Sequence, residues 1–310
     1  MRALAASLPP PLSATTNAAR KGNCGKVVII GGSNEYTGAP YFAGISALRS
    51  GADLAWVICA PAAGIPIKSL APDLIVIPTL ASLSGAQLVH PSNTTSGEIS
   101  AASSAIARAT SFVVGPGLGR SQQSWNDARA VIDEARVSGR PVVVDGDALW
   151  WCANDLSAIR GHPTAVLTPN AGELLRLCEK TGVSSSSDLA AVLGVAVLAK
   201  GATDQFTWGS REPMFCTKVG APRRCGGQGD VLAGSLGTWL SWAYNTTLIG
   251  NRTRADRVEA AVLAAATVTR VAAAKAFERN KRGMITADVI ALLPEAMEEC
   301  FPWQGEGGIL

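Results

Sequence analysis

The sequence predicts an α/β protein: a single domain built on a central, mostly parallel sheet that is flanked by helices. Short apolar runs rich in β-branched residues alternate with helical patterns from residue 26 onward, and this alternation is typical of strand-helix-strand units in a parallel sheet. The chain has 310 residues, 47% hydrophobic and 16% charged, so it can bury a sizeable core as one large domain. We expect that domain to span residues 21–303, with tails at 1–20 and 304–310.

Each predicted element has its own signal. Seven short apolar runs predict strands, at residues 26–31, 54–59, 73–77, 111–115, 141–145, 164–168 and 195–199. Helical patterns lie between several of them, at 38–50, 121–138, 170–181 and 187–193. Two further runs, 205–208 and 213–217, flank Gly209 and predict a hairpin. The C-terminal third is predicted to be helical, at about 230–244, 255–279 and 286–299, with an interruption at Pro294.

Polar and glycine-rich loops follow five of the predicted strands, namely GGSNEYTGAP, GPGLGR, DGDALW, PNAGE and KGATD. In open α/β sheets, ligands bind beyond the carboxyl ends of the strands, so these loops predict one crevice at that edge. The glycines at 31, 32 and 38 do not have the GxGxxG spacing. This excludes a Rossmann dinucleotide fingerprint in the first loop.

The segment RRCGGQGDVLAGSLG, residues 223–237, places three glycines and an acid where a loop turns into an apolar helix. Gly226, Gly227 and Gly229 allow backbone amides to approach an anion, and the helix points its positive end at the same place. Asp230 is then placed to remove a proton from a hydroxyl while the loop holds a phosphoryl group. The alternative is a glycine turn in which Asp230 only caps the helix.

The other loops each have a functional and a structural interpretation. Gly115, Gly117 and Gly119 either let the backbone approach a ligand or only form a strand-to-helix turn. Asp145 and Asp147 emerge from a buried strand and suit a metal at a phosphate site. Asp147 is the candidate metal ligand, and the alternative is that it caps a helix beginning at Ala148.

Two more positions stay open in the same way. Asn170 and Glu173 have the spacing of a capping box, which explains both without function, although a ligand could bind at that helix start. Lys200 follows an apolar strand and is placed to reach an anion. The alternative is an ordinary exposed lysine at a strand end.

Composition excludes several classes of protein. The net charge is +3 with no long basic run, so we expect no nucleic-acid or membrane partner. No apolar run is long enough to cross a bilayer; the best candidate is 260–274. Seven cysteines, an odd number without CxxC pairs, and two histidines support neither a zinc site nor a disulfide framework. We expect a cytoplasmic protein; a mitochondrial or plastid targeting segment within 1–20 and a homo-oligomer both stay open.

Seven motifs in order carry a family resemblance: KVVIIGGS, YTGAPYF, GPGLGR, DGDALW, TPNAGE, LAKG and RRCGGQGDVLAGSL. From about residue 21 to the last helix, the chain resembles the NAD(P)H-hydrate dehydratases, relatives of ribokinase and the vitamin kinases. The resemblance implies a ribokinase-like fold and repair of hydrated NADH or NADPH. The family uses a nucleotide to phosphorylate the ring hydroxyl transiently, and loss of phosphate then restores the reduced dinucleotide.

The resemblance also implies roles for particular residues. Asp230 matches the residue beside the substrate hydroxyl. The hydrated dinucleotide would be bound by Gly117, Gly119, Asn170, Ala171, Gly172, Glu173, Leu174, Leu175, Arg176 and Asp230. The nucleotide would be bound by Lys200, Gly201, Ala202, Thr203, Asp204, Gly220, Ala221, Pro222, Arg223, Arg224, Cys225, Gly226, Gly227, Gln228 and Gly229. With Gln228 after RRC, the chain looks more like ATP-using than ADP-using members, and Mg²⁺ is the implied cofactor.

No segment that resembles the companion epimerase precedes Lys21, so we expect action on the S epimer alone. One alternative is a kinase of the same superfamily for a hydroxymethylpyrimidine or hydroxyethylthiazole vitamin precursor. A nucleotide sensor without catalysis is a second, which the presence of Asp230 disfavours. A third is redox regulation through Cys225, because a helix N-terminus lowers a thiol pKa.

Overall fold

The computed structural model describes residues 5, 8, 22–81, 101–245 and 253–302. Within them a nine-stranded sheet has the order β3-β2-β1-β4-β5-β6-β7-β8-β9. Its strands are β1 Lys26–Ile30, β2 Leu54–Ile58, β3 Ile75–Ile77, β4 Ser111–Val114, β5 Val142–Val144, β6 Ala165–Leu167, β7 Ala196–Ala199, β8 Asp204–Trp208 and β9 Met214–Cys216. Strands β1 to β7 pair in parallel, while β8 and β9 form an antiparallel hairpin at one edge. The predicted parallel sheet and hairpin are confirmed.

The predicted helices are also present, with bounds shifted by at most two residues. They are α2 Gly38–Arg49, α6 Gln122–Ser138, α8 Ala171–Thr181, α9 Ser186–Leu193, α10 Gln228–Tyr244, α11 Arg254–Asn280, α12 Thr286–Ala291 and α13 Leu293–Cys300. The break between α12 and α13 falls beside Pro294, where a missing amide hydrogen suits the start of a new helix. The sequence interpretation missed α3 Pro61–Leu70 and α5 Ala101–Arg108.

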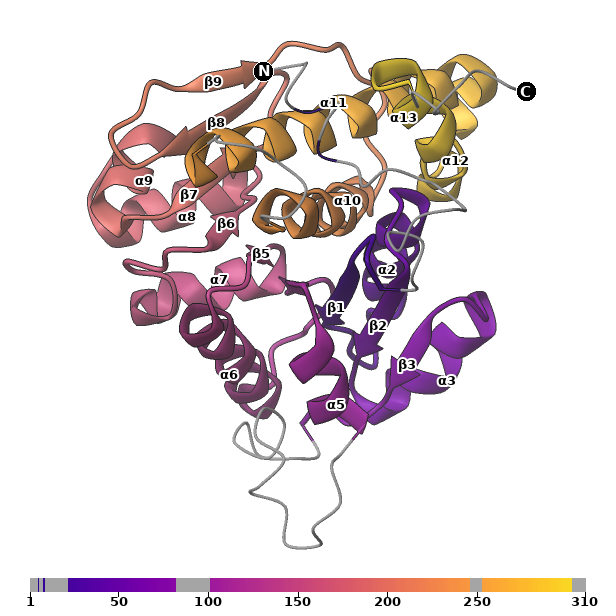
Figure 1. Cartoon of the computed structure of the whole chain (residues 1–310), viewed down its shortest axis with the longest axis horizontal. Coiled ribbons are helices and arrows are strands. Elements are labelled where there is room, and N and C mark those ends of the chain that lie inside the picture. Colours follow the sequence, from indigo (N-terminus) through magenta and orange to yellow (C-terminus); the bar gives the residue numbers. More distant parts are fainter. Residues whose placement is uncertain (1–4, 6–7, 9–21, 82–100, 246–252, 303–310) are drawn as a thin grey trace, which may run out of the picture.

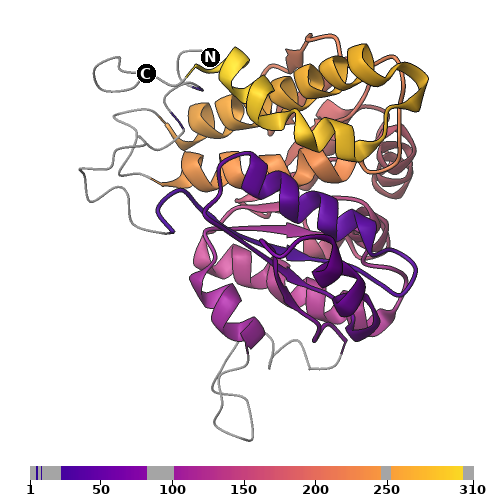
Figure 2. The same cartoon turned by 90° about the vertical axis from the view of Figure 1, so that its right-hand side faces the viewer.

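Helices cover both faces of the sheet (Figures 1 and 2). Side chains alternate along each strand, so Val27 and Ile29 enter one core while Val28 and Ile30 enter the other. The first core lies under α2, α3, α10 and α11, and the second under α5, α6, α7 (Asp147–Asn154), α8 and α9. Because both faces are buried, a ligand can reach the sheet only at the ends of its strands. The edge discussed below is the one formed by their carboxyl ends.

Helix α11 corrects one expectation from the sequence. Together with the short 3₁₀ turn after it, Arg254–Gly283 is long and apolar enough to span a membrane by length and composition, and no other part of the described chain is. However, 67% of its most apolar window is buried inside the protein. It packs against α10 and α13 as a core helix would.

Helices α2 and α10 cross in direct backbone contact. A β-carbon at Gly234 would collide with the carbonyl oxygen of Ala43, so only glycine allows this crossing. Ser50 and Ser235 are hydrogen-bonded in the same interface, with 2.9 Å between their hydroxyl oxygens. Because α10 begins directly after the glycine loop, this crossing sets the position of its first turn over the sheet edge.

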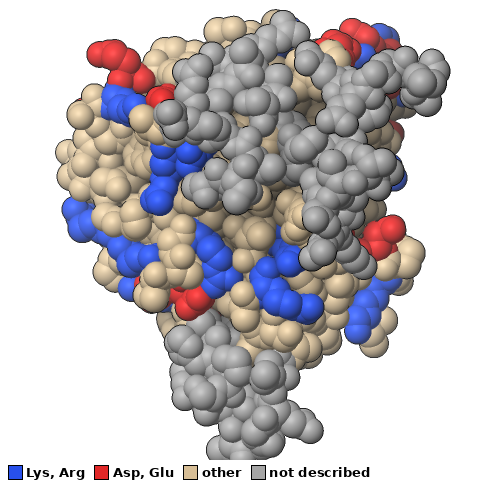
Figure 3. Space-filling view, in the orientation of Figure 1, with Lys and Arg blue, Asp and Glu red and all other residues tan. Residues whose placement is uncertain are grey.

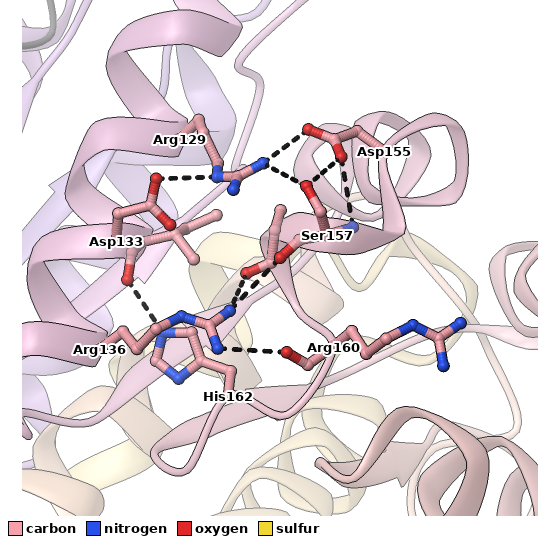
Figure 4. A network of polar contacts seen from close by, with 9 residues as sticks. Arg129, Asp133, Arg136, Asp155, Ser157, Arg160 and His162 are labelled. Atoms are coloured by element: carbon pink, nitrogen blue, oxygen red, sulfur yellow. Dashed lines mark hydrogen bonds and ion pairs between the residues drawn. The ribbon is translucent and has the colours of Figure 1, made fainter.

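A polar network joins α6 to the turn after α7 (Figure 4). Arg129 donates to Asp133 at 2.9 Å and to Asp155 at 2.6 Å, and Arg136 donates to three backbone carbonyls of that turn. His162 donates through Nε2 to a carbonyl of α6 and accepts through Nδ1 from an amide. Burial lowers the pKa of His162. With both ring nitrogens committed, we assign this network a structural role.

Candidate active site

Two cavities lie beyond the carboxyl ends of the strands, on either side of β5. The first, of about 870 Å³, follows β6 to β9 and is bounded by the starts of α8 and α10 and by α11. The second, of about 680 Å³, lies at the ends of β1 to β5 and the starts of α3 and α6. Both volumes are those of small-molecule binding sites.

A buried ion pair lies at the centre of this edge. Lys200, at the end of β7, places its Nζ 2.6 Å from Oδ1 of Asp145, at the end of β5. The Thr168 hydroxyl donates to the same oxygen at 2.7 Å, and only 3% of the Asp145 side chain is exposed. Burial alone would lower the pKa of Lys200, but Asp145 and Glu173 overcome this and hold it above its usual value. Lys200 therefore places a positive charge at the site, and a buried carboxylate holds it there. The alternative of an ordinary exposed lysine at a strand end is wrong.

Asp230 lies in the first turn of α10 beside this pair. Burial raises the pKa of its carboxyl to about 8, Asp145 adds to the effect, and Lys200 opposes it. Burial likewise raises the pKa of Glu173, against the pull of Lys200. A carboxyl with a pKa near the working pH can both accept and return a proton, which is what general acid-base chemistry needs.

The glycine loop forms the N-terminus of α10. Gly227 is its N-cap residue, with φ of 98°, and no side chain caps this end. Asp230 is therefore not the cap, and the alternative of a capped turn is wrong. A β-carbon at Gly227 would come within 2.6 Å of the Phe42 ring, and one at Gly229 within 3.1 Å of Lys200 Nζ. The loop leaves uncapped helix amides beside a cation, an arrangement that favours an anion.

The first cavity collects most residues of the predicted nucleotide site. Lys200 to Asp204, Gly220 to Pro222, Arg224, Cys225, Gln228 and Gly229 all line it. Arg223, Gly226 and Gly227 do not; Arg223 donates instead to the Met284 carbonyl at 2.9 Å. Thus twelve of the fifteen residues predicted to bind the nucleotide line the same cavity.

The residues predicted to bind the dinucleotide are divided between the two cavities. Asn170 and Ala171 line the first, and Asn170 and Glu173 form the predicted capping box. Gly119 lines the second cavity. Further along α8, Leu174 packs against the core and Leu175 is 61% exposed. The structure therefore brings the start of α8, rather than all of 170–176, to the site.

The GPGLGR loop has a structural role as well. All three of its glycines have positive φ. A β-carbon at Gly115 would collide with the carbonyl oxygen of Asp145, and one at Gly117 would come within 2.8 Å of Tyr36. These glycines let three strand-end loops pack together, and in doing so they bring the loop against the second cavity.

Asp147 does not cap a helix that begins at Ala148, whereas its role as a candidate metal ligand stays a prediction. Helix α7 begins at Asp147 itself, with Gly146 as N-cap residue and no side-chain cap. Its carboxylate accepts the Gly119 amide at 2.9 Å and pairs with Arg120 at 3.2 Å. Among the described residues no group of three or more His, Cys, Asp or Glu could hold a metal ion.

Sequence reasoning missed Arg270, which lies in the middle of α11. Its guanidinium donates to both oxygens of Asp204, each at 2.7 Å. It also donates to the carbonyls of Gly201, Ala202 and Lys218 at 2.7, 2.8 and 3.1 Å. This single side chain therefore joins the two loops that wall the first cavity. Its only sequence signal is a charge inside an apolar helix.

All seven cysteines are free thiols in the structure. Cys225 lines the first cavity, with its sulfur 3.4 Å from the Thr286 hydroxyl. Redox regulation through Cys225 stays a prediction. On the face shown in Figure 3, Lys and Arg side chains are spread over the surface, with neutral residues and a few Asp or Glu side chains among them.

Known proteins are similar to this chain over most of its length. A family model described as NAD(P)H-hydrate dehydratase matches residues 27–295. An "ATP-dependent (S)-NAD(P)H-hydrate dehydratase" of Ixodes scapularis is 39% identical, covering 96% of this chain and 95% of that protein. A protein of the same name from Sorghum bicolor is 38% identical, covering 94% of this chain and 75% of its own length.

Solved structures share the fold. An ADP/ATP-dependent NAD(P)H-hydrate dehydratase from Bacillus subtilis, co-crystallised with ATP and Mg²⁺, has a TM-score of 0.68 at 18% identity, with 97% of both chains covered. A putative ribokinase II from E. coli in complex with ATP and Mg²⁺ has a TM-score of 0.54 at 14% identity, covering 87% of this chain and 99% of the other. The predicted ribokinase-like fold is confirmed.

Proposed function

This chain belongs to the NAD(P)H-hydrate dehydratase family, and we propose that it uses ATP to dehydrate the S epimer of hydrated NADH and NADPH. The observation that carries this proposal is Asp230. Its carboxyl has a pKa raised to about 8 and lies at an uncapped helix start beside the Lys200–Asp145 pair. A proton acceptor and an anion site thus share one end of α10, as phosphorylation of a hydroxyl requires.

In the proposed reaction, Asp230 accepts the proton of the ring hydroxyl. The hydroxyl oxygen then bonds to the γ-phosphorus of ATP as the bond between that phosphorus and ADP breaks. The new phosphate ester then leaves as phosphate while the neighbouring ring carbon loses a proton, which restores the double bond. The sum is hydrated NADH plus ATP giving NADH, ADP, phosphate and a proton. Amides of the glycine loop and of α10 would stabilise the charge on the phosphoryl group.

Magnesium fits this site as an ion carried by the nucleotide. Mg²⁺ is commonly held by one or two carboxylates together with substrate phosphates, and it would neutralise phosphate charge. The nearby carboxylates of Asp145 and Asp147 are already paired with Lys200 and Arg120. We therefore assign most of its ligands to ATP. ATP is the proposed donor, and ADP is the alternative to test beside it.

The test of the proposed function is a comparison of substrates. Purified chain with ATP and Mg²⁺ is expected to restore the reduced nicotinamide absorbance of (S)-hydrated NADH, with release of ADP and phosphate in equal amounts. The pure R epimer serves as the control and should stay unchanged. A stable phosphorylated product from a hydroxymethylpyrimidine or hydroxyethylthiazole, with no action on hydrated NADH, would show the superfamily kinase instead.

Arg270 is expected to act as a positioning residue for ATP. Arg270→Lys keeps the charge beside Asp204 but cannot reproduce the planar fork that reaches both loops. We expect the KM for ATP to rise about tenfold, because one or two charge-assisted hydrogen bonds are lost, with little change in the KM for the hydrated dinucleotide. Steady-state kinetics with each substrate varied in turn measures this. Equal rises in both KM values would indicate a general loss of structure.

A further inference from the structure

The second cavity is a defined space that the roles assigned so far leave largely unused. Segments that follow the five parallel strands β1 to β5 surround it, and it is bounded by the start of α6 at Ser121 and Ser124. Leu80 and Leu118 give it an apolar floor, while Tyr36, 59% exposed, presents an aromatic ring. Apolar walls with a few polar groups are typical of small-molecule sites.

This cavity reaches the loop after β5, which also carries the buried Asp145. Gly119 and Asp147 line the cavity, and a β-carbon at Gly229, the neighbour of Asp230, would lie 3.8 Å from the Asp145 carboxylate. The Asp147 charge also contributes to the raised pKa of Asp230. The first cavity lies on the other side of β5 and contains the nucleotide loops that Arg270 holds. A reaction between two phosphate-bearing molecules needs room for both around Asp230. If ATP occupies the first cavity, the far end of the other molecule requires a second space.

Arg120 gives the second cavity a positive charge that can bind an anion. Its guanidinium lies 4.0 Å from the centre of the Trp150 ring and 3.2 Å from Asp147, which fixes the cation, while 53% of its side chain remains exposed. Five N–H donors allow a guanidinium to bind a second anion beside the one it already pairs with. It precedes Ser121, the N-cap of the 17-residue helix α6, so the positive helix end adds to the same field.

We propose that the second cavity binds the adenosine end of the hydrated dinucleotide. Arg120 and the start of α6 contact one of its phosphates, and the Tyr36 ring stacks on the base. Glu35, which also lines the cavity, accepts a hydrogen bond from a ribose hydroxyl, as an acidic residue does in other dinucleotide sites. This inference rests on the proposed function and extends it to the part of the substrate remote from the chemistry.

The test combines a variant with a truncated substrate. Arg120→Gln should raise the KM for (S)-hydrated NADH about tenfold or more, because a charge-assisted contact is lost, while the KM for ATP stays as in the parent. With the hydrate of reduced nicotinamide mononucleotide, which has no adenosine end, parent and variant should agree within about twofold. Comparing hydrated NADH with hydrated NADPH then identifies the phosphate: a larger penalty for NADPH indicates the ribose 2′-phosphate, and an equal one the diphosphate.

One further variant is a control, and another tests the stacking contact. Arg49→Gln removes an exposed arginine at the far end of α2 and should leave every KM unchanged. Tyr36→Ala should raise the KM for the full substrate as Arg120→Gln does, because the base loses its stacking partner. An unchanged KM for the full substrate in both cavity variants, or an equal penalty with the truncated one, overturns the inference. A parent without activity on hydrated NADH overturns the proposed function instead.

Discussion

Replacing Asp230 by Asn is expected to lower kcat by about a hundredfold to ten-thousandfold, the usual contribution of a general base. The amide has nearly the same size but cannot accept the hydroxyl proton. The variant should bind ATP as the parent does, because Gly227 rather than Asp230 forms the N-cap of α10. Turnover of (S)-hydrated NADH, together with calorimetric titration of ATP, measures both. A variant as fast as the parent would disprove the assignment of the base.

The pH dependence of the parent gives a separate readout for Asp230. Burial and the Asp145 charge raise its pKa to about 8, and a base works only when ionised. The kcat/KM of the parent, which reports on the free enzyme, should therefore rise with pH through about 8. The residual rate of Asp230→Asn should lack this rise. A flat parent profile across that range would contradict the assignment.

The same raised pKa predicts the sign of a stability change. Its folded value of about 8 lies above the ordinary 3.8, so the folded state holds the proton more tightly than the unfolded state. The stability that the bound proton contributes is fully present below pH 3.8, and it is lost as pH rises through the folded pKa of about 8. Asp230→Asn should therefore gain stability relative to the parent as pH is raised across that window. Urea unfolding midpoints of both proteins, measured side by side, test this.

Local sequence patterns predicted the long elements well because both faces of the sheet are covered. Strands buried on both sides are continuous apolar runs, as in Val142–Val144. The missed helices lack such patterns. Helix α3 contains Gly64 and Pro66, which ordinarily end a helix. Helix α5 has only eight residues, AASSAIAR, and Ile106 is its one large apolar side chain, so it shows no clear helical period.

The candidate site was predictable where one segment carries the chemistry. The glycine loop and Asp230 are neighbours in sequence, so their meeting needed no tertiary information. Lys200 and Asp145 are 55 residues apart, and only the sheet order shows that they form a pair. Arg270 is 66 residues from Asp204. A charge within an apolar helix has no local pattern that would reveal its partner.

The second large effect is expected at the Lys200–Asp145 pair. Lys200→Met keeps a chain of similar length but leaves Asp145, 3% exposed, without its cation. Removing one partner of a buried ion pair costs about 3–5 kcal/mol of unfolding free energy, and urea denaturation should show a loss of this size. Asp145→Asn together with Lys200→Met removes both charges, so we expect most of that loss to be restored. If the double variant is as unstable as the single one, packing rather than charge accounts for the loss.

Activity should respond differently from stability in these two variants. Lys200 is the cation that opposes the raised pKa of Asp230, whereas Asp145 and Glu173 reinforce it. In the single variant Lys200→Met, the carboxylates repel one another, the pKa of Asp230 rises further and the kcat/KM profile should move to higher pH. The double variant also removes the Asp145 charge, so its profile should return towards that of the parent. If Lys200 also contacts the phosphoryl group, kcat should stay low in both variants. A low kcat with a restored profile would separate a role in binding phosphate from a role in tuning the base.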